Sequence, residues 1–139
     1  MGNRTLTQEY ALYAYDCIKD IKKIKDKKIQ EKYSSRVKKL PAMITHNGLL
    51  TTLTFLYSKS EFDKNRFPKN AESLLLQHII SWLKYGKLEE IHKQEISSFI
   101  EDLAKKHFQD LMLYSRRTLT LAQWLKRLAE GEFEDAKDE

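Results

Sequence analysis

The sequence predicts an all-α fold: a single-domain bundle of about five to seven helices. Only four glycines and two prolines occur in 139 residues, so few positions break a helix. Apolar residues recur at steps of three and four along most of the chain, as they do on one face of an α-helix. A hydrophobic fraction of 41% can supply one core at this length, and a charged fraction of 32% leaves a well-solvated surface.

The first predicted helix begins after Thr5, which has the spacing of a capping box with Gln8. Its apolar stripe continues for about five turns. The stripe consists of Leu6, Tyr10, Tyr13, Ala14, Cys17, Ile21 and Ile24. The lysine-rich residues 22–28 interrupt it, and we interpret them as a helix end and a short connection. Cys17 is the one cysteine, so it cannot form an internal disulfide, and we expect a buried thiol in a reducing cytoplasm.

The second predicted helix resumes the apolar period at Ile29 and runs to Leu40. Pro41 disfavours a helical conformation at the residue before it. We therefore expect a break there, followed by a short new helical segment over residues 41–45. The following residues 46–48 (HNG) are a turn signal, and Asn47 is predicted to cap the next helix.

A third helix is predicted over residues 49–59, which are apolar on nearly every side and so belong in the middle of a core. Three threonines in this segment also allow a strand, because β-branched residues favour sheets. We prefer the helix, since no second strand candidate exists to pair with it. The segment does not suit the DNA-reading helix of a helix–turn–helix protein, because Lys59 is its only charged residue.

The second half of the chain predicts three more helices. Residues 60–69 are polar and form the longest loop, and a fourth helix over residues 71–85 ends at Gly86. A fifth helix is expected from Ile96 to residue 113, and a last one from residue 114 until Gly131 stops it. The acidic residues 132–139 are predicted to be a flexible tail of one domain that spans residues 1–139.

The charge is distributed unevenly along the chain. The net charge is +5, but residues 1–70 hold 15 Lys or Arg against 7 Asp or Glu, whereas residues 71–139 hold 10 against 13. Most of the excess lies in residues 19–39, with ten basic and three acidic side chains. Such asymmetry favours a polyanionic partner on one side of the molecule.

No motif for catalysis, metal binding or cofactor binding is present in the sequence. The four histidines lie too far from one another and from Cys17 for a zinc site. Neither a glycine-rich phosphate loop nor a Gly-x-Ser-x-Gly motif occurs. No apolar run approaches the ~18 residues that span a membrane. We therefore expect a cytoplasmic binding protein that is not an enzyme and uses no cofactor or metal.

Basic residues at helical spacing predict a nucleic-acid-binding surface. In the second helix four cations follow one another at steps of four, four and three, which places them on one face: Lys28, Lys32, Arg36 and Lys39. In the last helix the apolar stripe is flanked by Arg116, Arg117, Lys126 and Arg127. Such clusters can neutralise consecutive phosphates, although for any single lysine a solvated face is the simpler interpretation.

Three blocks of sequence carry a family resemblance. The first is residues 4–8 (RTLTQ), which lead into Tyr13 and Ala14. The second, the most specific, is residues 37–49 (VKKLPAMITHNGL), continued by residues 53–59 (LTFLYSK). The third is residues 114–118 (YSRRT), followed by residues 124–131 (WLKRLAEG). In this order and spacing, over almost the whole chain, they resemble the small subunit of the Cmr complex, the type III-B CRISPR effector.

The resemblance implies an all-α fold, with residues 49–59 as helix, and a subunit that has no catalytic role. It implies that several copies stack head to tail into a minor filament, and that the subunit contacts guide RNA and target RNA without sequence specificity, together with other Cmr subunits. Backbone contacts are expected from Lys39, Lys59, Arg116, Arg117, Lys126 and Arg127, and the helical spacing adds Lys32 and Arg36.

Two other functions remain open from the sequence. The chain could be a stand-alone helical nucleic-acid-binding module, or a protein–protein adaptor whose lysines only make it soluble. A salt-sensitive RNA affinity separates the module from the adaptor. Recovery of partners and guide RNA in stoichiometric amounts separates the complex subunit from the module. In a stack, the basic second helix of one copy could meet the acidic residues Glu132, Glu134 and Asp135 of the next.

Overall fold

The first helix, α1 (Leu6–Lys23), begins at the predicted cap in the computed structural model, which describes residues 3–133. Thr5 Oγ1 accepts a hydrogen bond from the Gln8 amide (3.1 Å), and Gln8 Oε1 accepts one from the Thr5 amide (2.8 Å). The next helix begins after Asp26, whose side chain accepts from the Lys28 amide (3.0 Å). The predicted cap and the predicted lysine-rich connection are therefore confirmed.

Helix α2 (Lys27–Asn47) continues through Pro41, so the predicted break at this proline is wrong. Pro41 has no amide hydrogen, and its ring crowds the preceding turn, at a cost of about 3 kcal/mol or more. Leu40 and Ile44, on either side of it, are both buried in the same core. Burying such a side chain contributes about 1.5–3 kcal/mol. The two together offset the proline, so tertiary packing keeps the helix intact.

Helix α3 (Leu49–Ser58) confirms the helical interpretation of this segment. The predicted cap is wrong, because Asn47 is the last residue of α2 and α3 has no side-chain cap. Gly48 alone makes the turn, with a φ of +86° that favours glycine. Thr52 is buried and donates to the Gly48 carbonyl (2.8 Å). A threonine hydroxyl that bonds to the preceding turn thus fits a helix as well as a strand.

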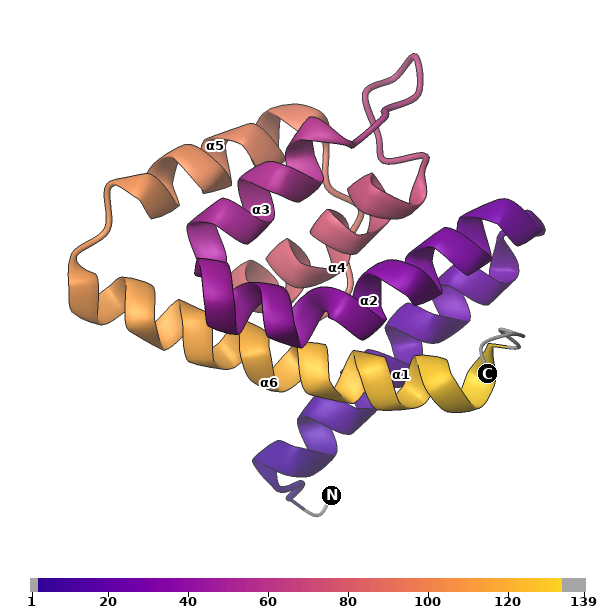
Figure 1. The fold of residues 1–139 in the computed structure, drawn as a ribbon, viewed down its shortest axis with the longest axis horizontal. Coiled ribbons are helices and arrows are strands. Elements are labelled where there is room, and N and C mark those ends of the chain that lie inside the picture. The colour runs from indigo at the N-terminus through magenta and orange to yellow at the C-terminus, as the bar shows by residue number, and fades with distance from the viewer. Residues whose placement is uncertain (1–2, 134–139) are drawn as a thin grey trace.

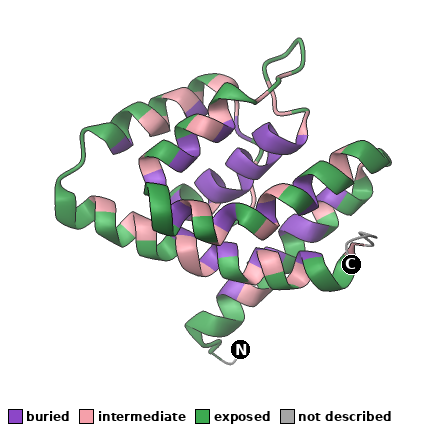
Figure 2. Cartoon of the chain, viewed as in Figure 1, coloured by how far each residue is buried: buried purple, intermediate pink, exposed green. Residues whose placement is uncertain are grey.

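Helix α4 (Ala71–Tyr85) lies at the centre of the bundle (Figure 2). Residues 71–81 are all buried. Asn70 and Ser73 form a capping box at its start, and Gly86 ends it in the left-handed conformation, with a φ of +69°. The helix contacts α2, α3, α5 and α6, so nearly every side of it meets another element.

The predicted C-terminal end of the fifth helix is wrong. Helix α5 (Lys93–Ala104) stops well before residue 113, and α6 (Phe108–Glu132) begins with His107 as its N-cap. Leu103 is the last buried residue of α5, and residues 104–110 are all exposed, so no core contact holds the chain helical there. Gly131 lies inside α6 and does not stop it. The predicted tail beyond Phe133 lies outside the described residues.

The six helices form one all-α bundle, as predicted, with no strand within residues 3–133. The long helix α6 lies across both α1 and α2, while α3, α4 and α5 pack together beside α2, and α3 and α4 also contact α6 (Figure 1). Residues 59–70 form the predicted loop, which contains one isolated bridge between Phe62 and Pro68. In the described part of the chain, no helix is both long and apolar enough to cross a membrane.

A buried polar cluster joins α1, α2 and α4. The imidazole of His78 is fully buried, and its Nε2 lies 2.9 Å from Asp20 Oδ2 while its Nδ1 lies 2.7 Å from Tyr33 Oη. Because a carboxylate can only accept, Nε2 donates to Asp20; in the neutral imidazole Nδ1 then accepts from the Tyr33 hydroxyl. Tyr13 donates to the main-chain carbonyl of His78. One residue of α4 therefore fixes the positions of both neighbouring helices.

Cys17 is fully buried between these helices, which confirms the predicted buried thiol. Burial raises the pKa of the Cys17 thiol well above its usual value, since a thiolate would lose its hydration there. We expect a thiol reagent to leave Cys17 unmodified in the folded protein and to modify it in denaturant. Mass spectrometry of both samples measures this. Modification of the native protein at the rate of a free thiol would contradict the buried position.

Candidate nucleic-acid interface

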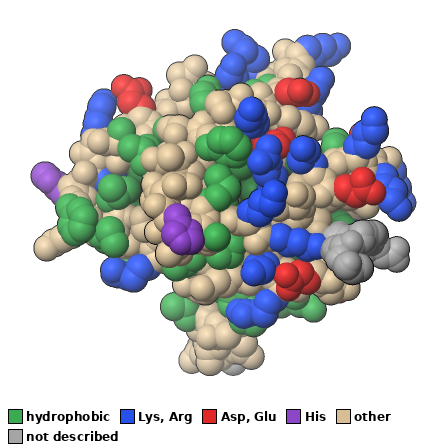
Figure 3. All heavy atoms as spheres, viewed as in Figure 1, with side chains coloured by type: hydrophobic (Ala, Val, Ile, Leu, Met, Phe, Trp, Pro, Cys, Tyr) green, Lys and Arg blue, Asp and Glu red, His purple; other side chains and the backbone are tan. Residues whose placement is uncertain are grey.

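The exposed face of α2 carries the cations that the helical spacing predicted. Lys28, Lys32 and Lys39 are all exposed, and they lie on the side opposite the buried Tyr33 and Val37. A band of Lys and Arg side chains covers the surface over α2 (Figure 3). Lysines on the outer side of a helix present mobile ammonium groups, which can neutralise phosphates without reading bases. This face is the first part of the candidate interface.

Arg36 does not share the solvent-facing position of these lysines. Its Nε lies 2.7 Å from Glu72 Oε2, and the two side chains are only 21% and 7% exposed. The guanidinium also lies over the ring of Phe55, 5.1 Å from its centroid. Arg36 therefore neutralises a buried carboxylate on α4, and less of its charge is available to a phosphate.

Lys59 lies close to Arg36 in space although 23 residues separate them in the sequence. Its Nζ lies 5.9 Å from the centroid of the same Phe55 ring, so both cations contact one aromatic side chain. Lys59 is exposed. The fold thus extends the basic surface of α2 to the end of α3, as the sequence alone could not establish.

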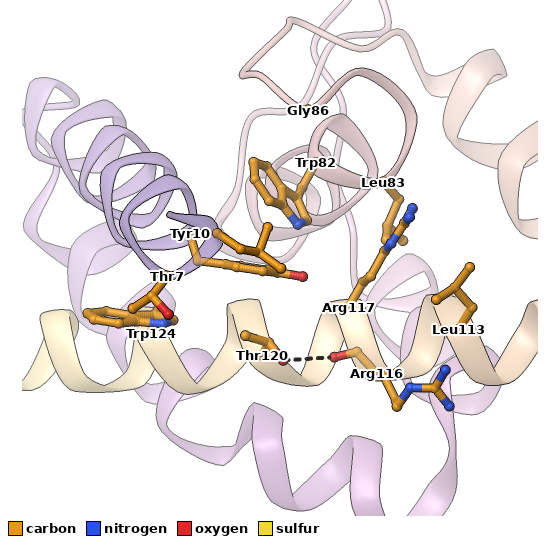
Figure 4. Close-up of a pocket in the computed structure, with 11 residues that line it drawn as sticks. Thr7, Tyr10, Trp82, Leu83, Gly86, Leu113, Arg116, Arg117, Thr120 and Trp124 are labelled. Atoms are coloured by element: carbon orange, nitrogen blue, oxygen red, sulfur yellow. Dashed lines mark hydrogen bonds between the residues drawn. The ribbon is translucent and has the colours of Figure 1, made fainter. Parts of the chain in front are cut away.

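Arg116 and Arg117 line a groove between the start of α1, the end of α4 and the middle of α6 (Figure 4). Its volume is about 780 Å³, and its other walls include Tyr10, Trp82 and Trp124. The Arg117 side chain rises from α6 toward the end of α4. Both arginines are exposed, and within residues 3–133 neither guanidinium makes an ion pair.

Lys126 and Arg127 lie further along α6, about 15 Å from Arg116 and Arg117 at the rise of an α-helix. The Arg127 guanidinium lies over the indole of Trp124, 4.9 Å from the ring centroid. Lys126 is half-buried. The basic residues of α6 are therefore two pairs in different surroundings. Of the four, only Arg116 and Arg117 line the groove, and Figure 4 shows the Arg117 side chain turned toward α4 and the Arg116 guanidinium on the outer edge of α6.

Sequence reasoning missed the aromatic walls of this groove. Tyr10, Trp82 and Trp124 come from three helices that are far apart in the chain, and each is on a stripe that is typical of a core. Trp82 and Trp124 are only half-buried. No local pattern distinguishes such a position from a core position, because the exposure depends on where the neighbouring helix ends.

Three of the four histidines make side-chain hydrogen bonds to other groups of the described chain. His78 belongs to the buried cluster, His92 accepts from the Gln94 amide at the start of α5 (3.0 Å), and His46 Nδ1 lies 2.9 Å from the Ala42 carbonyl. Among residues 3–133, no group of three or more His, Cys, Asp or Glu side chains is placed to hold a metal ion.

Comparison with known proteins gives a consistent result. The family described as CRISPR-associated protein (Cas_Cmr5) matches residues 6–132. The CRISPR system Cmr subunit Cmr5 of Thermotoga maritima is 29% identical over 133 residues, which cover 94% of this chain and 86% of that protein.

A solved structure has the same fold. The crystal structure of a CRISPR-associated Cmr5 family protein from Thermus thermophilus matches with a TM-score of 0.71 and 23% identity, over 94% of this chain and 100% of that one. At this identity the match supports the fold alone. The family match spans all six helices of the bundle, from the start of α1 to the end of α6. The chain therefore belongs to the CRISPR-associated Cmr5 family, as the three sequence blocks indicated.

Proposed function

We propose that this chain is the non-catalytic small subunit of a type III-B CRISPR effector, the Cmr complex, and that it binds the backbone of guide and target RNA without reading sequence. The related Thermotoga maritima protein is named as a Cmr subunit, which supports the assignment to a complex. The proposed partners are the other Cmr subunits and both RNAs. The cytoplasm is the compartment in which such a complex would act.

The exposed lysine face of α2 is the observation that carries the RNA-binding role. Lys32 and Lys39 project from one side of a helix that is anchored through Tyr33 and Val37, so the cations are held in a row on a rigid element. A subunit that accepts any target must contact phosphates and sugars, because base edges differ between targets. Lys59, at the end of α3, extends the same surface.

Several copies would stack head to tail in the assembled complex. Such contacts need two different faces that complement one another, and they give an open array when the rotation does not close a ring. The lysine face of α2 and the acidic residues of the second half provide opposite charges. Glu132 is already paired with Lys22 of its own chain (2.6 Å), so it contributes less to a contact between copies than the sequence alone indicated.

Affinity purification from the native cell tests the assignment. We expect a particle of several subunits that holds short RNAs with a shared, repeat-derived end. Recovery of the chain alone, free of RNA at low salt, would refute the assignment and leave an adaptor with an unknown partner. Recovery with RNA but without protein partners would favour the stand-alone module.

Reversing two charges on α2, Lys32→Glu with Lys39→Glu, is expected to weaken single-stranded RNA binding about tenfold at low salt. The slope of log affinity against log salt is negative, and each lost phosphate contact should reduce its magnitude by about 0.7. Fluorescence anisotropy with a labelled oligonucleotide at several salt concentrations measures both quantities.

The matched control reverses the charge of two exposed lysines between α5 and α6, Lys105→Glu with Lys106→Glu. It changes the net charge by the same amount as the α2 double variant. This variant should keep most of its affinity, because the lysines lie outside the proposed interface. Equal losses in the two double variants would show that only net charge matters and that α2 has no special role.

A further inference from the structure

Both tryptophans of the chain line the groove between α1, α4 and α6. They come from different helices, and each keeps part of its indole exposed. Figure 4 shows Trp82 and Trp124 with Tyr10 along the groove and Arg117 beside them. A partly exposed indole offers a flat aromatic face to a ligand, and Trp and Tyr are enriched at binding interfaces for this reason.

The indoles are held in place by their neighbours. Trp82 packs against Tyr10 and Tyr13, with ring centroids 4.9 and 4.7 Å apart, and both tyrosines are buried. Trp124 is covered on one side by the guanidinium of Arg127. A ring that is already ordered loses little conformational entropy when a ligand stacks on it.

The charge of the groove is positive. Its lining residues include Arg116 and Arg117 and no Asp or Glu. Arg36 pairs with the carboxylate of Glu72, and the guanidinium of Arg127 lies over the indole of Trp124. The two groove arginines, in contrast, make no ion pair within the described residues. The volume of about 780 Å³ lies within the range of about 300–1,000 Å³ typical of ligand sites.

We propose that this groove binds a single-stranded RNA segment by stacking bases on Trp82 and Trp124 while Arg116 and Arg117 hold the adjoining phosphates. Bases of any identity stack on aromatic rings, so the site would be tolerant of sequence. This inference rests on the proposed RNA-binding function and adds to it a second site, distinct from the lysine face of α2, that contacts bases as well as phosphates.

An acidic, apolar peptide is the competing occupant, because Leu6 and Leu113 on the rim are 68% and 40% exposed. The flat rings and the two planar guanidinium groups favour RNA, since each can stack on a base and each arginine can also bind a phosphate through two N–H groups. The groove therefore offers a combination of aromatic rings and guanidinium groups, unpaired within the described residues, that matches a nucleotide.

Tryptophan emission of the full-length chain provides a direct test, because both fluorophores lie in the groove. The protein is titrated with a short, unstructured oligouridylate, and emission is recorded together with the anisotropy of a labelled copy of the same RNA. Inorganic polyphosphate of matched charge serves as a ligand with phosphates and no bases. We expect RNA to quench the emission and polyphosphate to leave it nearly unchanged.

Variants assign the effect to the groove. Arg117→Ala and Trp124→Leu should each weaken RNA binding about tenfold. Trp82→Phe retains the ring packing on Tyr10 and leaves Trp124 as the single reporter. Lys64→Ala, an exposed cation in the loop before α4, removes the same charge as Arg117→Ala and should have little effect. Circular dichroism confirms that each variant is folded before its affinity is compared.

Three results would overturn the inference in distinguishable ways. RNA binding by anisotropy without quenching, and with Arg117→Ala unaffected, would remove the groove site and leave the α2 interface intact. No RNA binding at any salt concentration would remove both proposals. Quenching by a synthetic peptide of residues 132–139, with none by RNA, would make the groove a protein-docking site.

Discussion

His78→Ala is expected to lower the free energy of unfolding by about 3–4 kcal/mol. The substitution removes a fully buried imidazole and leaves a cavity between α1, α2 and α4. It also leaves the hydroxyl of Tyr33 buried without its acceptor, because the fully buried tyrosine has no direct access to water. Asp20, which is 32% exposed, can instead return to solvent. Thermal unfolding should show a melting temperature about 10 °C lower.

His46→Ala is the matched control for this substitution. His46 is exposed and makes one hydrogen bond, to a carbonyl of its own helix, so its removal should cost less than about 0.5 kcal/mol. Tyr33→Phe removes only the buried hydroxyl and should cost about 1–2 kcal/mol. Equal stability of the two histidine variants would contradict the buried cluster as a source of stability.

Arg36→Ala should destabilise the fold by about 3 kcal/mol, because it leaves the carboxylate of Glu72 buried without a counterion. The Glu72 side chain is only 7% exposed, so little of the lost interaction with Arg36 can be replaced by solvent. Denaturant unfolding measures the loss. Arg36 belongs to the basic row that the spacing predicted on α2, so the same variant also tests whether it acts in RNA binding or in folding.

Replacing both partners, Arg36→Met with Glu72→Met, should cost less than removing the arginine alone, since no buried charge is then left unpaired. Lys84→Ala breaks a pair with Glu95 whose side chains are 35% and 28% exposed, and it should cost less than about 1 kcal/mol. A stable Arg36→Ala variant with weakened RNA binding would reverse the interpretation and make Arg36 a phosphate contact.

The helices themselves were predictable from local patterns. The capping box at Thr5, the left-handed Gly86 and the apolar period of α1 depend on residues within a few positions of one another, and these interactions form in the same way in any context. The lysine face of α2 was predictable for the same reason, because residues at steps of three and four share a side of a helix wherever it packs.

Tertiary contacts produced the remaining features. The continuity of α2 through Pro41 depends on a core that buries residues on both sides of it, and the pairing of Arg36 depends on a glutamate 36 positions away on α4. The groove depends on where α1 starts and α4 ends relative to α6. The sequence pattern around each aromatic residue of the groove is the same as that around an aromatic residue of the core, so the pattern cannot tell the two positions apart.

The fold class, most of the helices and the charged faces of those helices thus follow from interactions within a few turns, and local sequence patterns predict them. The tertiary structure decided which cations are neutralised by a carboxylate and which remain available to a ligand. Exposure and pairing are properties of side chains from helices that meet only after folding, and no spacing along the chain encodes the distance between them.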